Sequence, residues 1–120
     1  MSSFIRNSRF DIRPFAFDIL RMLDLATASR TQFEPCVGQT FELPATNGTI
    51  ALTLAEARPL GTTRPGAARD PFALTFHGAP ALRLPQGIYR LEHTTLGSME
   101  IFLVQVAADA TASHFEAVFN

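Results

Sequence analysis

Apolar and polar residues alternate with a period of two through most of the chain after residue 38. In residues 49–57, for example, Ile50, Leu52 and Leu54 lie on one face of an extended chain and the residues between them on the other. Such alternation is typical of a half-buried β-strand. Six segments show it: residues 39–43, 49–57, 72–77, 87–93, 98–107 and 114–119.

Short connections between these segments favour antiparallel pairing. Asn47-Gly48 is a dipeptide typical of tight hairpins, and residues 94–97 form another short return. Longer loops are expected at residues 58–70 and 78–87, which are rich in Pro and Gly. The sequence therefore predicts a mainly β fold, with about six antiparallel strands in a small barrel or sandwich.

The first 38 residues carry a helical pattern instead. Apolar residues at helical spacing predict a helix over residues 11–28, and a second short helix is expected over residues 29–34, which precede Pro35. Asp18, Arg21 and Asp24 interrupt the apolar stretch, which argues against an export signal or a membrane span. We expect an N-terminal extension over residues 1–21 and one β-rich domain over residues 22–120.

Composition narrows the classes of partner. A chain of 120 residues suits one domain. Its net charge of −1 and its scattered arginines give no electrostatic reason for binding nucleic acid or a membrane. Cys36 is the only cysteine, so no intrachain disulfide can form and a reducing, cytoplasmic location is expected. The thiol is interpreted as a packed bystander.

The segment 98–107 is apolar on both faces, which sets it apart from the other strands. One face presents Phe102 and Val104, which we assign to the core. The other presents Met99, Ile101 and Leu103, which form a candidate interaction surface. The strand is expected either to be central to a closed barrel or sandwich, or to be covered on its outer face by the N-terminal helix or by a partner. The remaining predicted core residues are Phe41, Leu52, Phe72, Leu74, Phe76 and Phe115.

Few residues could carry chemistry. His77, His93 and His114 lack metal-binding spacing, so no metal site or cofactor is expected. Glu92 and Glu100 could meet across the turn at residues 94–97, as the paired carboxylates of a hydrolase do. Arg90 shares their face, and a cross-strand salt bridge within this polar cluster is the preferred interpretation. No catalytic residue is therefore assigned.

Several stretches resemble the DUF6916 family, small bacterial proteins of unknown function. They are residues 33–41 (FEPCVGQTF), 72–78 (FALTFHG), 84–93 (LPQGIYRLEH), 96–97 (LG), 101–104 (IFLV) and 115–120 (FEAVFN). The resemblance runs from about Met22 to the C-terminus. It implies no activity and no site residues. It implies a start close to Met22 and an accessory role in a phage-tail-like structure.

Three functions remain open from the sequence. The first is a structural or interaction protein that binds a protein partner or forms a homo-oligomer, as the two-sided strand at residues 98–107 suggests. The second is a small β-barrel that binds a small molecule in a Phe-lined pocket. The third, an enzyme, has the least support, because no catalytic constellation is visible.

Overall fold

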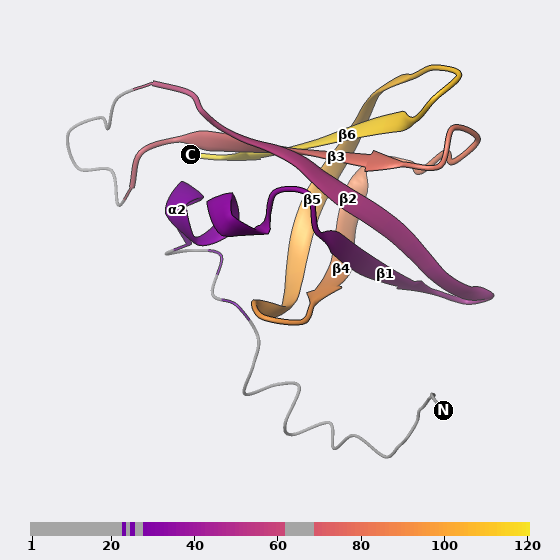
Figure 1. Ribbon diagram of the computed structural model, residues 1–120, viewed down its shortest axis with the longest axis horizontal. Helices are drawn as coiled ribbons and strands as arrows, with labels where there is room; N and C mark the ends of the chain where they lie inside the picture. The colour runs from indigo at the N-terminus through magenta and orange to yellow at the C-terminus, as the bar shows by residue number, and fades with distance from the viewer. Residues whose placement is uncertain (1–22, 24, 26–27, 62–68) are drawn as a thin grey trace, which may run out of the picture.

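The chain folds into a closed antiparallel β-barrel preceded by a short helical segment (Figure 1). The structure is a computed structural model and describes residues 23, 25, 28–61 and 69–120. Its helical elements are α2 (Arg30–Phe33) and the 3-10 turn η1 (Glu34–Cys36). Its strands are β1 (Thr40–Ala45), β2 (Gly48–Pro59), β3 (Phe72–Gly78), β4 (Gly87–His93), β5 (Gly97–Ala108) and β6 (Ser113–Phe119).

The barrel consists of two three-stranded meanders that close on each other in the order β1-β2-β3-β6-β5-β4. The first meander joins the second where β3 pairs with β6 over seven residue pairs, from Phe72↔Phe119 to Gly78↔Ser113. The second closure is much thinner, because β4 meets β1 at the single pair Glu42↔Glu92. The predicted six antiparallel strands are confirmed, and the barrel is confirmed over the sandwich.

Local sequence explains the hairpins and the bends. The β1–β2 hairpin turns at the predicted Asn47-Gly48, and Gly48 has a φ of 136°, which favours glycine. β2 and β5 each have twelve residues and each carries a bulge, between Leu54 and Glu56 and between Gln105 and Ala107. A bulge increases local bend and twist, which lets a long strand follow the curved wall of a small barrel.

The helical segment closes one end of the barrel. Ser29 begins α2: its amide donates to Gln32 Oε1 at 2.8 Å, and the Gln32 amide donates to the Ser29 carbonyl at 3.0 Å. Phe33 is fully buried against Phe72 and Phe119, with ring centroids 6.0 Å away in both cases. The predicted helix at residues 29–34 is thus confirmed in a shorter form, continued by η1.

The predicted helix at residues 11–28 and the extension at residues 1–21 lie largely or wholly outside the described residues. Three positions of that helix are described, Leu23, Leu25 and Ala28, and none of them is helical. Leu23 instead donates its amide to the Ser98 carbonyl at 2.8 Å, beside the start of β5.

The barrel interior is filled by aromatic and aliphatic side chains from all six strands. Two pairs of rings pack within it: Phe72 stacks on Phe119 with centroids 4.6 Å apart, and Phe41 and Phe76 pack edge to face with centroids 5.3 Å apart. The predicted core residues that the structure confirms are Phe41, Leu52, Phe72, Leu74, Phe76 and Phe115, all with no exposed surface.

Two predicted core residues were placed on the wrong side of β5. Phe102 is 51% exposed and Val104 only half-buried, because both lie on the outer face of the barrel. Their assignment failed because both faces of β5 are apolar, so alternation alone does not say which one points inward. Pairing with β4 decides it, since Leu91 is fully buried and stands opposite Met99.

Candidate interaction surface

Two exposed large apolar side chains, one of them the most exposed among the described residues, meet on the outer face of the β4–β5 hairpin. Ile88 on β4 is 71% exposed, and its register partner on β5 is Phe102. Directly opposed residues of an antiparallel pair have their Cβ atoms about 4.5–5.5 Å apart, so the two side chains form one apolar row. Figure 1 shows this hairpin behind β1 and β2, on the far wall of the barrel.

The next outward row of the same hairpin is charged. Arg90 stands opposite Glu100, and both are exposed. Arg90 Nε lies 3.4 Å from Glu92 Oε2 on its own strand, and Arg90 Nη2 donates to Ser98 Oγ at 3.1 Å. We call Ile88, Phe102, Arg90 and Glu100 together the hairpin face.

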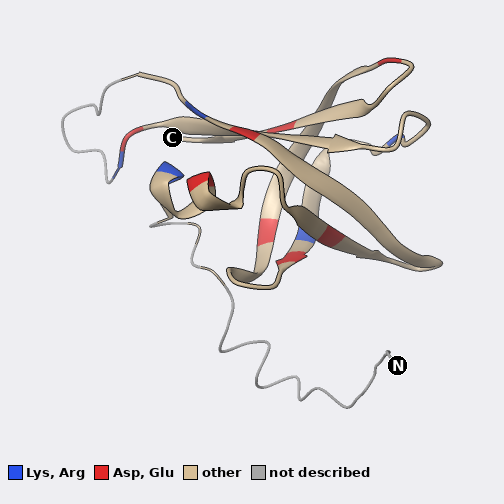
Figure 2. Ribbon diagram, viewed as in Figure 1, with Lys and Arg blue, Asp and Glu red and all other residues tan. Residues whose placement is uncertain are grey.

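The predicted polar cluster therefore exists, with a different pairing. The ion pair runs along β4, from Arg90 to Glu92, rather than across to β5. Glu92 stands opposite Ser98, so Glu92 and Glu100 do not oppose each other as a carboxylate pair. Figure 2 shows the basic and acidic positions side by side on β4 and β5, with a further acidic position on β1.

The predicted interaction surface of Met99, Ile101 and Leu103 is wrong. Met99 and Leu103 are fully buried and Ile101 is 2% exposed, because all three point into the barrel. Glu100 was the signal that could have identified the faces. It shares its face with Phe102, and a carboxylate without a buried partner must face water. β5 does carry an apolar face outside the core, but it is the face of Phe102 and Val104.

The apolar surface continues along β5 beyond the hairpin face. Val104 follows Phe102 on the same side and is half-buried, and Val106 at the bulge is 55% exposed. The other exposed large apolar side chains among the described residues lie elsewhere: Val37 before β1, Leu60 after β2 and Val118 on β6. The β5 side of the barrel thus carries the main apolar cluster.

The His93 ring makes contacts that hold the β4–β5 turn. The ring is buried, stacks on Phe41 at 4.5 Å, and accepts at Nδ1 from the Thr95 and Leu96 amides, both at 3.1 Å. Because Nδ1 accepts, the proton lies on Nε2, which donates to Gln39 Oε1 at 2.6 Å. Burial lowers the pKa of His93, so the neutral ring is favoured.

The other two histidines, which are far apart in the sequence, are cross-strand neighbours. His77 on β3 stands opposite His114 on β6, and their ring centroids are 4.4 Å apart. His114 Nε2 lies 3.0 Å from Asp109 Oδ2. The pKa of Asp109 lies well below its usual range, chiefly because its carboxylate accepts from the Thr111 hydroxyl. Hydrogen bonds from His114 and from the backbone amides of Thr111 and Ala112 lower it further. These bonds fasten the β5–β6 turn.

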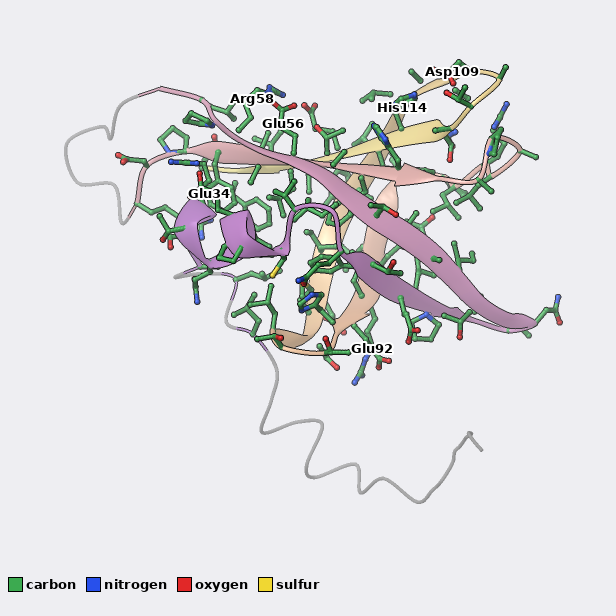
Figure 3. The ribbon with its side chains drawn as sticks, in the orientation of Figure 1. Glu34, Glu56, Arg58, Glu92, Asp109 and His114 are labelled. Carbon is green, nitrogen blue, oxygen red and sulfur yellow. The ribbon has the colours of Figure 1, made fainter. Side chains whose placement is uncertain are left out.

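The titratable clusters do not converge on one cleft. Figure 3 places Glu92 at the β4–β5 turn, and Asp109 and His114 at the opposite, β5–β6 end. Within the described part of the chain, no group of three or more His, Cys, Asp or Glu side chains could hold a metal ion.

Cys36 is buried, and burial raises the pKa of its thiol, as expected for an unreactive packed cysteine.

Arg69 is a residue whose role the sequence did not reveal. Its Nη1 donates to the carbonyls of Leu25 (2.6 Å) and Ala28 (2.8 Å), and its Nε donates to that of Asn120 (3.2 Å). The guanidinium also lies over the Phe119 ring, 5.3 Å from its centroid. Arg69 therefore ties segments from the two ends of the chain to the barrel. The only sequence signal for this role is the position of Arg69 shortly before β3.

None of the helices within residues 23, 25, 28–61 and 69–120 is long and apolar enough to cross a membrane.

Comparison with known proteins finds a family model that matches most of the chain. The model of DUF6916, a domain of unknown function, matches residues 28–119, which include α2 and all six strands. No curated protein and no solved structure matches the chain. Because the family model covers well over half of the sequence, from the buried Ala28 to the last residue of β6, the chain belongs to the DUF6916 family.

Proposed function

We propose that this protein is a non-catalytic interaction module that binds a protein partner through the hairpin face. The observation that carries the proposal is the exposed row of Ile88 and Phe102, 71% and 51% exposed, on adjacent strands. Scattered exposed apolar residues are normal in proteins, but a contiguous apolar patch rimmed by charge is typical of an interaction site.

The free energy available from this row is useful but modest. Covering the exposed parts of Ile88 and Phe102 would contribute about 1–2 kcal/mol each. Phe102, with Ile88 opposite it and Arg90 diagonal to it on β4, has the composition of an interface anchor, since aromatic residues and arginine are enriched at interfaces. The face lies on paired strands, so little conformational entropy is lost when it is covered.

Two other observations favour binding over catalysis. The hydrogen bonds of His93, and those of Asp109 with His114, fasten turns. The side chains inside the barrel pack against one another, and no contact of the described residues favours a small-molecule ligand there. A setting in a phage-tail-like assembly stays a prediction, supported only by the family resemblance.

The experiment compares retention of partners on the immobilised full-length chain, using extract of the native cells. The test variant is Ile88→Ser with Phe102→Ser, and the control is Leu60→Ser, which removes an exposed apolar side chain beyond the end of β2. We expect the wild type and the control to retain the same protein, and the double variant to lose it. Equal retention by all three would contradict the proposal.

A further inference from the structure

We propose that the partner of the hairpin face is a second copy of this chain, related to the first by a two-fold axis parallel to β4 and β5. This inference rests on the proposed function and deepens it. The pattern of the four residues in the face carries it.

The hairpin face has one apolar row and one charged row, in register. Ile88 on β4 opposes Phe102 on β5, and two residues along, Arg90 on β4 opposes Glu100 on β5. A two-fold axis that lies in the interface and runs along the strands exchanges β4 of one copy with β5 of the other. Ile88 then faces Phe102 of the other copy, and Arg90 faces Glu100 of the other copy. Every contact occurs twice, as an isologous interface requires.

The charged row favours a two-fold axis along the strands over an axis across them. With the axis across the strands and midway between the two rows, Arg90 would face the apolar row of the other copy. Its guanidinium, which contacts Glu92 and Ser98 of its own chain, would then lose water without gaining a partner. With the axis along the strands, each Arg90 gains a carboxylate. Glu100 is suited to accept it, because it is exposed and makes no ion pair with the described residues. A two-fold axis along the strands thus makes the face complementary to itself.

The size of the face predicts a weak dimer. The β4–β5 ladder has seven residue pairs. At about 3.4 Å per residue and about 5 Å between strands, it covers a few hundred Å² per copy. Stable complexes bury about 800 Å² per partner, so we expect reversible association in the micromolar range or weaker. The measurement must therefore extend to about 1 mM protein.

The experiment uses sedimentation velocity of the full-length chain and two charge-reversal variants, Arg90→Glu and Glu100→Arg. Each variant alone would place like charges against each other at both contacts, so we expect at least a tenfold loss of self-association. An equimolar mixture of the two variants restores opposite charges at both contacts, so we expect dimers to return. Leu60→Asp, an exposed change beyond the end of β2, is the control and should associate as the wild type does.

Three results would overturn the inference: a wild type that stays monomeric to about 1 mM, a dimer that neither variant weakens, and a mixture no more associated than its components. Circular dichroism of each variant checks its fold, and Ile88→Ser provides a second, uncharged test at a position that is 71% exposed. A monomer that still retains another protein through Ile88 and Phe102 would overturn the second copy and leave the proposed function standing.

Discussion

Single polar residues in this barrel serve mainly to fasten its turns and its ends. His93 joins the β4–β5 turn to the segment before β1, and Arg69 joins the segment before α2 to the residue after β6. The sequence showed these residues but not their partners. The bonds of Arg69 and the bond from His93 to Gln39 join groups far apart in the chain, and those from Thr95 and Leu96 require that His93 Nδ1 carries no proton. Only the fold brings such groups together.

The stability of the protein should fall with acid through His93. Its pKa in the folded state lies below the value of about 6.5 for an unfolded histidine, because burial disfavours the charged ring. Its contribution is therefore complete above pH 6.5 and is lost as the pH falls through the folded pKa. Urea unfolding between pH 8 and pH 5 measures this loss.

Replacing the ring isolates its effect. In His93→Phe, the amides of Thr95 and Leu96 lose their acceptor, so we expect a loss of about 1–3 kcal/mol at pH 8. The variant should also show a flatter decline between pH 6.5 and pH 5 than the wild type. An unchanged slope in His93→Phe would contradict the assignment.

At the scale of elements, truncating a side chain on the inner face of β5 should cost more stability than truncating its neighbour on the outer face. Leu103 is fully buried, so Leu103→Ala should lower the free energy of unfolding by about 2–5 kcal/mol. Phe102 is half exposed, so Phe102→Ala should cost less than Leu103→Ala although it removes a larger side chain. Denaturant unfolding of the two variants compares them. The reverse order would place Phe102 in the core.

The sequence predicted the elements of this fold better than their faces. All six strands and the short helix were recognisable, because alternation, Asn47-Gly48 and the loop residues are local signals. The inward face of β5 was not predicted, because Met99 and Ile101 are no more apolar than Phe102 and Val104 and alternation carries no direction. The hairpin face was missed for the same reason, although Ile88 and Arg90 on β4 already shared one side.

At the scale of the whole molecule, the order of the strands came from long-range pairing that no local signal reports. β3 pairs with β6, which lies more than 30 residues further along the chain, and β1 closes on β4 at Glu42↔Glu92. The sequence therefore left barrel and sandwich open. The thin closure is the weakest junction in the described barrel, and two carboxylates stand opposite each other there.

Neutralising one of these carboxylates should strengthen the closure. Like charges directly opposite in a sheet are destabilising, so Glu42→Gln should raise the free energy of unfolding by about 0.2–1 kcal/mol at low salt. The gain should shrink in about 1 M NaCl, which screens the repulsion. Thermal unfolding at both salt concentrations measures it. Glu56→Gln, which faces Thr75, controls for the lost charge and should give no gain.

Tyr89 gives this barrel a natural optical reporter. It is the only tyrosine of the chain, which has no tryptophan, so near-ultraviolet emission arises essentially from one site. Its hydroxyl donates to the Pro85 carbonyl at 2.5 Å, and its backbone lies between Ile88 and Arg90. Emission intensity and anisotropy can therefore test the proposed association of two copies in the unmodified protein, with no attached dye to disturb a contact this small.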